Sequence, residues 1–381
     1  MLIGIGWIGF DLGFLYPITH IEKIHCLVSR SDIVIVDGNQ NHFGHRLTKR
    51  EDFFKASIDK EAPIGLVMGE GNDSVHLPFR ALKIIETPNV EGVFAIGIGV
   101  DGELCRLDKE WKLIEEHARP FPMSIQHAIV VDEHLIATWI DRELMIARMG
   151  CLPIDEPFKE GVERGDLRAS RLLEHAILPA GAAWAHVLDA EPLAMTNMGD
   201  GFAFVLWNRG VYAFDVTGVE RWRAPPPKWP ELANLPMSQE TVELLQTDTT
   251  IEVWSRAGGC LRLSKTNGSQ IGTGHFNLDG ALSNVYGSTS VRLLLLSNGR
   301  CYLYRGGDKI AELSTQGPIQ HALYIDESTW ILSGWREEIL LEQSGVKTQK
   351  QDEVVVQHIM KGEQLWLLTN DGILHHSILT E

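Results

Sequence analysis

Short apolar segments separated by turn residues recur along the chain, and two of them are near copies of each other. Ile125–Ile136 and Ile319–Trp330 both begin Ile-Gln-His-Ala and continue through an apolar stretch to Asp-Glu. A third relative, Val356–Met360, begins Val-Gln-His and follows Ile319 after the length of one small supersecondary unit. The pattern therefore predicts a repeat protein rather than a series of unrelated domains.

Each repeat starts with a predicted inner strand, which is followed by a second apolar strand and a tight turn. Eight such inner strands begin near Ile24, Leu82, Ile125, Leu193, Val242, Leu282, Ile319 and Val356. Asp101-Gly102, Asn298-Gly299 and Asp371-Gly372 stand between β-rich runs, where both residues tolerate the positive φ of a hairpin turn. We expect eight four-stranded antiparallel sheets, with seven as the alternative because the gaps before Leu82 and Leu193 are wide.

The clearest repeat is Phe202–Arg223. Within it, Gly210–Trp222 reads Gly-Val-Tyr-Ala-Phe-Asp-Val-Thr-Gly-Val-Glu-Arg-Trp. This pattern resembles a blade of the PQQ-like and WD-type β-propellers, and the resemblance implies a fold, not an activity. A single blade cannot bury both faces of its sheet. We therefore expect an all-β closed β-propeller, in which the blades stack as a ring around a channel.

The last repeat lacks one strand. It ends after Ile373–Leu379, and Leu2–Phe10 is an apolar segment that can supply the missing strand. Pairing the two ends of the chain would remove an open sheet edge. The sequence therefore predicts that residues 1–381 form a single propeller domain, whose ring is closed by the N-terminal strand.

Three segments break the repeat and are predicted to be insertions on the rim. Asp59–Phe79 is rich in glycine, and Cys151–Val187 contains a helical periodicity over Val162–Ile177. The third, Ala224–Met237, is rich in proline. Because proline lacks the amide donor that a strand ladder needs, this third segment is expected to be an extended loop.

Composition disfavours several classes of function. The 381 residues carry a net charge of −17 and no block of Lys or Arg, so nucleic acid and anionic membranes are not expected as partners. The five cysteines are scattered without a C-x-x-C pair, as expected of buried thiols in a reducing compartment. The apolar N-terminus lacks a basic region and is interrupted by Asp11, so we expect a cytoplasmic protein.

The N-terminal region also contains a dinucleotide-binding pattern. Gly4–Gly9 matches G-x-G-x-x-G, and Ile33–Asp37 looks like a strand that ends in an acidic, ribose-binding residue. However, Asp11 and Pro17 interrupt the place where the phosphate-binding helix would begin. Asp37 also fits a hairpin of the first repeat. We therefore expect no bound dinucleotide and no other cofactor.

Histidines recur at positions that suggest a metal site. Gln126-His127, Gln320-His321 and Gln357-His358 lie on predicted inner strands, where a ring of imidazoles would bind a metal or an anion. Four more histidines fall on predicted strands of the first and last repeats: His42, His45, His375 and His376. Adjacent residues on a strand point to opposite faces, so the last two cannot both face one ion. We favour hydrogen bonding between blades, and we predict no metal site and no catalytic residue.

The leading hypothesis is a non-catalytic protein–protein interaction scaffold or adaptor, a subunit of a cytoplasmic multiprotein assembly such as one built around an ATPase. The alternative is a small-molecule enzyme or sensor that uses the central channel. Rim loops are predicted to hold the partner, and the rigid proline-rich loop is the strongest candidate. Its predicted partner-binding residues are Pro225, Pro226, Pro227, Trp229, Leu232 and Leu235. For Trp229, the alternative is that the indole folds back and seals a blade.

Overall fold

The computed structural model describes the strands at 24–29 and 32–37, and then residues 74–172, 177–288, 290–326, 328–342, 345–377 and 379. The chain divides into two compact units, Met1–Glu70 and Gly71–Glu381. In the first unit, β1 (Ile24–Ser29) and β2 (Asp32–Asp37) form an antiparallel hairpin with Ile24 opposite Asp37. Asp37 is therefore a hairpin residue, as the repeat pattern predicts. The motif Gly4–Gly9 and the histidines at 42 and 45 lie outside the described residues.

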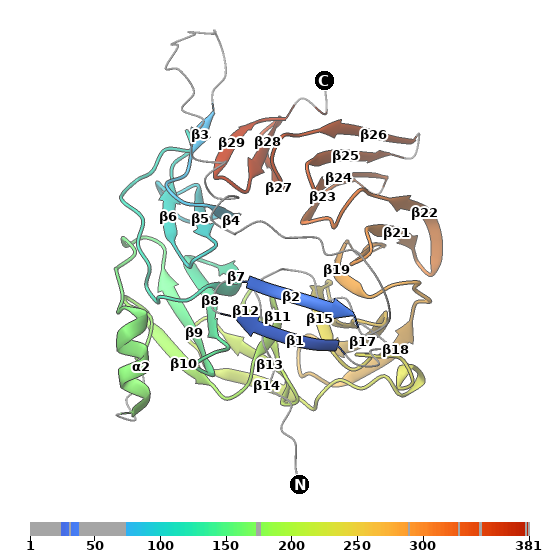
Figure 1. The fold of residues 1–381 in the computed structure, drawn as a ribbon, viewed down its shortest axis with the longest axis horizontal. Helices are drawn as coiled ribbons and strands as arrows, with labels where there is room; N and C mark the ends of the chain where they lie inside the picture. The colour runs from blue at the N-terminus through green and yellow to red at the C-terminus, as the bar shows by residue number, and fades with distance from the viewer. Residues whose placement is uncertain are drawn as a thin grey trace. The chain divides into compact units, whose positions relative to one another are not determined.

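The second unit is a β-propeller of seven blades (Figure 1). Written from the inner to the outer strand, blade one is β4 (Ala81–Glu86), β5 (Ala95–Gly99) and β6 (Leu104–Leu107); blade two is β7 (Ile125–Val131), β8 (His134–Asp141), β9 (Ile146–Pro153) and β10 (Trp184–Leu188); blade three is β11 (Pro192–Asn197), β12 (Gly201–Leu206), β13 (Gly210–Asp215) and β14 (Glu220–Ala224); blade four is β15 (Thr241–Gln246), β16 (Thr250–Ser255), β17 (Gly259–Ser264) and β18 (Gln270–His275).

The remaining blades have four strands each. Blade five is β19 (Leu282–Gly287), β20 (Val291–Leu296), β21 (Arg300–Arg305) and β22 (Asp308–Ser314); blade six is β23 (His321–Asp326), β24 (Thr329–Gly334), β25 (Glu337–Glu342) and β26 (Gly345–Lys350); blade seven is β27 (Val355–Lys361), β28 (Gln364–Thr369), β29 (Ile373–His376) and β3 (Val75–His76). Each inner strand contacts the inner strands of both neighbouring blades, from β4 round to β27 and back to β4. The turn glycines Gly102, Gly299 and Gly372 all have positive φ, as the hairpin signals predict.

The preferred count of eight blades is wrong. The hairpin counted as the first repeat, β1 with β2, forms a two-stranded sheet of its own. Ring closure by Leu2–Phe10 is also not what the propeller uses. The short strand β3 completes blade seven, with Val75 opposite Leu374 and His76 opposite Ile373. Because β3 directly precedes blade one along the chain, it joins the first blade to the last without a long connection.

The insertions are only partly as predicted. Asp59–Phe79 contains the closing strand β3 rather than being a rim loop throughout. Cys151–Val187 contains the helix α2 (Arg164–Leu172), inside the predicted range, but also most of the outer strand β10. Ala224–Met237 is a loop with one short 3-10 turn, η1 (Pro230–Leu232). Within the described residues, no helix is long and apolar enough to cross a bilayer.

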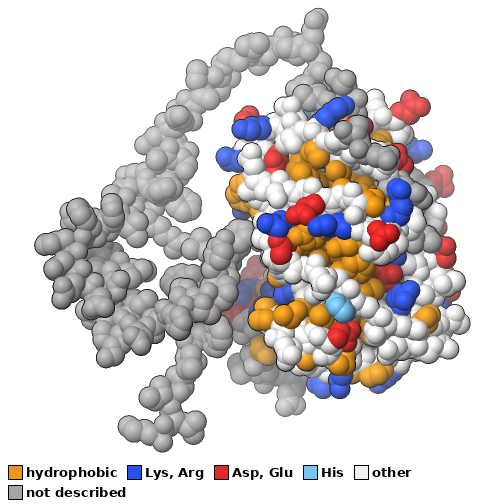
Figure 2. Space-filling model, turned by 90° about the vertical axis from the view of Figure 1, so that its right-hand side faces the viewer, with side chains coloured by type: hydrophobic (Ala, Val, Ile, Leu, Met, Phe, Trp, Pro, Cys, Tyr) orange, Lys and Arg blue, Asp and Glu red, His pale blue; other side chains and the backbone are white. Residues whose placement is uncertain are grey.

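The core lies between the blades, where the faces of adjacent sheets pack on each other. Trp139, Trp254 and Trp330 on second strands are at most 1% exposed. Four of the five cysteines, Cys105, Cys151, Cys260 and Cys301, are buried free thiols, as predicted. Burial raises the pKa of the Cys105 thiol to about 12, so that thiol stays protonated and unreactive. On the side that carries β18 and β22, patches of hydrophobic side chains lie between charged groups at the surface (Figure 2).

Candidate functional site

A β-bulge near the start of most inner strands turns one polar side chain toward the next blade. The bulge follows Ala81 in β4 and Ile125 in β7, and the next paired residues are Lys83 and His127. Lys83 Nζ donates a hydrogen bond to the Ala128 carbonyl in blade two over 2.7 Å. His127 Nε2 lies 3.2 Å from the Pro192 carbonyl in blade three. These inner polar groups therefore join neighbouring blades.

Gln357 has the same role between the last blade and the first. The oxygen of its side-chain amide accepts a hydrogen bond from the Ile84 backbone N–H at 2.8 Å, and the amide nitrogen donates one to the Ile84 carbonyl at 2.9 Å. The bulge in β27 follows Val355, so Gln357, and not His358, matches His127 in register. The third Gln-His pair is therefore displaced by one residue from the first. Hydrogen bonding between blades, which the sequence favours for these pairs, is confirmed for His127, Gln357 and His358.

Glu243 is the residue that follows the bulge in β15 of blade four. Its charge interacts electrostatically with that of Lys83 in blade one. Burial lowers the pKa of Lys83 to about 8, against the opposing attraction of Glu243. Burial raises the pKa of Glu243 to about 7, while hydrogen bonds from Leu244 and Asn284 and the charge of Lys83 act in the opposite direction. A convergent pair of shifted groups is a feature of ligand sites as well as of structural networks.

A buried Ser-His-Glu arrangement links blades six and seven. His358 Nδ1 lies 2.7 Å from Ser333 Oγ, and His358 Nε2 lies 2.8 Å from Glu338 Oε2. Burial alone would raise the pKa of Glu338, but hydrogen bonds from His358 and Ser377 outweigh it, and the pKa is lowered. Ser333, Glu338 and His358 are all 0% exposed. No substrate can reach this hydroxyl in the folded state, so the network stabilises the interface rather than forming a nucleophilic triad.

Among the described residues, His375 and His376 do not form a metal site with their neighbours. His375 Nδ1 lies 3.0 Å from the His376 carbonyl, and the His376 ring packs on Trp366 with centroids 3.9 Å apart. Across the part of the chain that the structure describes, no group of three or more His, Cys, Asp or Glu side chains is placed to hold a metal ion.

The predicted partner-binding loop divides into a buried part and an exposed part. Trp229 is 0% exposed and Leu232 is buried, and the Gln239 side-chain amide bonds to both the N–H and the carbonyl of Trp229. Leu235 is 50% exposed, Pro225 is exposed, and Pro226 and Pro227 are half-buried. The indole of Trp229 therefore seals the core between blades three and four, while the prolines and Leu235 remain at the surface.

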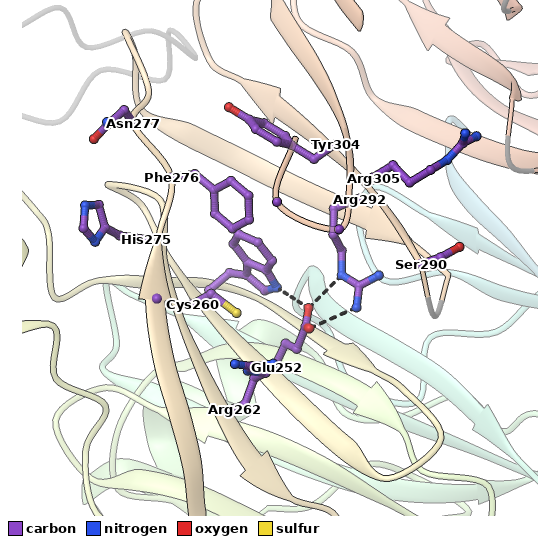
Figure 3. Close-up of a pocket in the computed structure, with 14 residues that line it drawn as sticks. Glu252, Cys260, Arg262, His275, Phe276, Asn277, Ser290, Arg292, Tyr304 and Arg305 are labelled. Carbon is purple, nitrogen blue, oxygen red and sulfur yellow. Dashed lines mark hydrogen bonds and ion pairs between the residues drawn. The ribbon is translucent and has the colours of Figure 1, made fainter. Parts of the chain in front are cut away.

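A cleft with a volume of about 880 Å³ lies between blades four and five (Figure 3). It opens between β18 and the hairpin that joins β21 to β22, and its lining includes Phe276, Tyr304 and Arg305. None of these residues belongs to a recognisable sequence motif, and the lining comes from the separate strands of two consecutive blades. The sequence therefore gives no signal for this cleft.

An ion pair forms the floor of the cleft. Arg292 Nε and Nη2 donate to the two carboxylate oxygens of Glu252 at 2.8 Å and 2.9 Å, and Trp254 Nε1 lies 3.2 Å from Oε2 (Figure 3). Arg262 also lines the cleft and is exposed to solvent. Two-pronged pairing of this kind holds both charged groups in a fixed geometry. The cleft thus has a rigid polar floor and an additional guanidinium at its wall.

Solved structures with the same fold differ widely in sequence from this chain. The β-propeller domain of Cps50 (Swd1) from Myceliophteria thermophila matches with a TM-score of 0.58 at 10% identity, covering 80% of this chain and 97% of that one. BamB from Moraxella catarrhalis matches with a TM-score of 0.51 at 11% identity, covering 80% and 97%. The computationally designed Ika8 protein matches with a TM-score of 0.51 at 10% identity, covering 80% and 99%.

These similarities show the fold alone. They include a WD-type and a PQQ-like propeller, so the resemblance seen in Gly210–Trp222 is confirmed at the level of architecture. No protein-family description matches the chain, and no curated protein matches it. The unit Gly71–Glu381 is therefore a seven-bladed β-propeller.

Proposed function

We propose that this propeller is a non-catalytic scaffold that binds other proteins through its rim, as a subunit of a cytoplasmic multiprotein assembly. An assembly built around an ATPase remains one candidate. Propellers commonly serve as rigid platforms for protein partners, and this generalisation supports the proposal. The observation that carries the proposal is the exposure of apolar side chains on the proline-rich loop and on the blade-three turn near it.

We call this surface the loop rim and define it by Trp207, Pro226, Pro227, Leu235 and Met237. Trp207, Leu235 and Met237 are 50%, 50% and 59% exposed. Pro226 and Pro227 of the same loop help to line a cleft of about 410 Å³, together with Leu206 and Asn208 on either side of Trp207. Apolar side chains that gather at a surface are typical of interaction sites, and prolines hold such a surface with little loss of entropy on binding.

The test is a charged substitution in the loop rim. In the double variant Leu235→Asp/Met237→Asp, we expect loss of the partners that co-purify with the wild-type protein from native lysate, with an unchanged melting temperature. Met145→Asp is the matched control, because Met145 is 82% exposed in blade two, away from the loop. Partners retained by the double variant at wild-type levels would contradict the proposal. Trp229→Ala does not serve here, because removing a buried indole is expected to destabilise the fold.

A second candidate function is a small-molecule enzyme or sensor that uses the channel, and the coupling of Lys83 to Glu243 favours it. A ligand that binds between these groups would stabilise the folded protein. A thermal-shift screen with small carboxylic acids and amines tests this function. We expect a true channel ligand to raise the melting temperature of the wild type but not of Lys83→Met. A ligand that stabilises both proteins equally would bind elsewhere.

A further inference from the structure

In blades two and three, the outer strand carries a tryptophan that covers the following blade. Trp184 Nε1 in β10 donates to the Val216 carbonyl over 2.8 Å. Trp222 Nε1 in β14 donates to the Lys265 carbonyl over 3.0 Å. Each indole therefore closes the outer part of one interface with a large apolar surface and one hydrogen bond.

The matching position in blade four is a glycine. Trp184 pairs with Cys151, Trp222 with Ala213, and Gly272 with Arg262, at equivalent places in the three sheets. In blade five, Gly306 stands at the position of Val216 and Lys265, whose carbonyls accept the indole hydrogen bonds. Among the described residues, no indole of blade four donates a hydrogen bond to Gly306, and Gly306 lines the open cleft. Blade four therefore has no indole at the place where Trp184 and Trp222 close the outer parts of the two preceding interfaces.

The Arg262 side chain extends into this space. A Cβ built on Gly272 would lie 3.4 Å from Arg262 Nη2 and 3.9 Å from Cζ, so the guanidinium reaches outward from β17 over β18. Within the described part of the chain, this guanidinium has no hydrogen bond or ion pair. Glu252, the one acidic side chain among the described residues of the lining, is already paired to Arg292. The Arg262 guanidinium can therefore donate hydrogen bonds to a carboxylate that enters the cleft from outside.

Strand β18 is also an edge without the usual protection. In the described propeller it pairs only with β17, and its sequence, Gln-Ile-Gly-Thr-Gly-His, contains no Asp, Glu, Lys or Arg. The outer strands β14, β22 and β26 all contain charged residues, which hinder pairing with another chain. Strand β10 has none either, but its Trp184 and His186 bond to the backbone of blade three. Among these outer strands, β18 therefore combines an uncharged edge with an open cleft.

We propose that blade four binds an extended acidic segment of a partner protein as a fifth strand along β18, with a carboxylate of that segment paired to Arg262. Neighbouring strands lie about 4.8 Å apart, and alternate side chains of an added strand share one face. Acidic side chains on the face beside Gly272 would then meet the Arg262 guanidinium. This surface is separate from the loop rim, so the inference goes beyond the proposed scaffold surface.

Charge supports this choice of ligand locally, although the chain as a whole is acidic. The net charge of −17 repels an acidic segment at long range. At about 0.15 M salt, however, screening limits that repulsion to roughly 8 Å, whereas a two-pronged guanidinium–carboxylate contact acts at hydrogen-bond distance. Binding at physiological salt is therefore decided by Arg262 and its neighbours in the cleft.

The test uses a fluorescein-labelled peptide of four Val-Glu repeats, titrated with the full chain at 150 mM NaCl and followed by anisotropy. We expect the peptide to bind, and the amides of Gln270–His275 to gain protection from hydrogen exchange when it does. Arg262→Ala should weaken binding about tenfold or more, because one charge-assisted contact is lost. Gly272→Trp keeps Arg262 and should weaken peptide binding by the same factor. Its indole would cover this interface as Trp222 covers the interface between blades three and four.

Arg209→Ala is the control, since it removes one positive charge from an exposed arginine of blade three and should bind like the wild type. Circular dichroism establishes that each variant is folded. The proposal is overturned if the peptide does not bind, if Arg262→Ala and Gly272→Trp bind it as well as the wild type, or if a Val-Lys peptide binds equally. Displacement of the peptide by an equal concentration of glutarate would overturn strand addition, because a free dicarboxylate has no backbone to pair with β18.

Discussion

The interface between blades three and four and the interface between blades four and five have the same strand geometry but opposite chemistry. The face that blade three turns to blade four is apolar, with Ala203, Val205, Val211, Ala213 and Trp222. The matching positions on the face that blade four turns to blade five are Glu252, Trp254, Cys260, Arg262 and Gly272. One interface is sealed, and the other holds an ion pair and an open cleft.

This difference separates two contributions to a propeller. Backbone ladders and hairpin turns build every blade alike, whatever faces its neighbour. Side-chain volume at the outer strand then decides whether the gap between two blades closes. Trp222 is 7% exposed and fills its interface, whereas Gly272 leaves space that Arg262 enters. A binding surface can therefore arise in a repeat fold from one missing side chain.

The largest effect is expected from opening the sealed interface. Trp222→Ala should lower the free energy of unfolding by about 4 kcal/mol, because a buried indole and its bond to the Lys265 carbonyl are lost. Urea denaturation followed by fluorescence measures the change. Trp207→Ala in the same blade is the control and should cost less than about 1 kcal/mol, since Trp207 is half exposed. Equal losses in the two variants would mean that Trp222 does not seal the interface.

Removing one partner of the ion pair in the open interface should lower the free energy of unfolding more than replacing both partners with apolar side chains. Arg292→Met leaves Glu252 without its partner in a largely buried place and should cost about 3 kcal/mol. The double variant Glu252→Leu/Arg292→Met removes both charges and should recover much of that loss. Denaturant midpoints of Arg292→Met, Glu252→Leu and the double variant measure the coupling between the two side chains. Additive losses would show that the two side chains act independently.

The inner end of the open interface should respond to pH. Glu243 has a pKa of about 7 in the folded protein against an ordinary value of 4.5, so its carboxyl stays protonated to a higher pH in the folded state than in the unfolded state. Stability from this group is therefore complete below pH 4.5 and is lost as the pH rises through 7, by an amount on the order of 3 kcal/mol. Glu243→Gln should abolish this loss.

The measurement for Glu243 is the urea midpoint of wild type and variant at pH 5 and pH 7.5. The comparison must be a difference between the two proteins, because His127 titrates in the opposite sense. Burial lowers the pKa of His127 to about 4, so that group removes stability as the pH falls below 6.5. A wild type and variant with parallel pH profiles would show that Glu243 does not titrate in this range.

The smallest effect is expected from closing the open interface. Gly272→Trp should change the free energy of unfolding by about 1 kcal/mol or less, because the cleft has room for the indole and only the flexible end of Arg262 must move. Thermal unfolding measures the change, with Gly274→Ala as a control on the same strand. A loss of several kcal/mol would mean that the two interfaces differ in backbone geometry as well as in side chains.

Much of the fold is predictable from local pattern, and the errors have local causes. Hairpin signals such as Asn298-Gly299 identify the blades because the turn geometry depends on neighbouring residues only. The hairpin β1–β2 has the same apolar pattern as the first strands of a blade, so the pattern predicts an eighth blade there. Nothing in its sequence indicates that, among the described residues, β1 and β2 would pair with each other and not within a four-stranded sheet. Likewise, the closing strand β3 is too short to give a recognisable strand pattern. The longer apolar segment Leu2–Phe10 is therefore predicted to close the ring in its place.

The candidate site is harder to predict because it depends on register. The turn between β17 and β18 is one residue longer than the turn between β13 and β14, so direct alignment on the leading glycines places Trp222 opposite Ile271. The observed pairing instead makes Gly272 its counterpart. A shift of one residue moves a strand's side chains to the other face of the sheet. The sequence repeat thus hides the substitution of tryptophan by glycine that opens the cleft.

By itself, the sequence determined the repeated antiparallel blades, the position of the helix and the burial of the described cysteines, because each follows from short-range periodicity and turn chemistry. Only the tertiary structure decided the number of blades, the strand that closes the ring, the burial of Trp229 and the meeting of Arg262 with Gly272. These features depend on which strands pair and in what register. Such pairings are set by packing between residues far apart in the chain, and no local pattern records them.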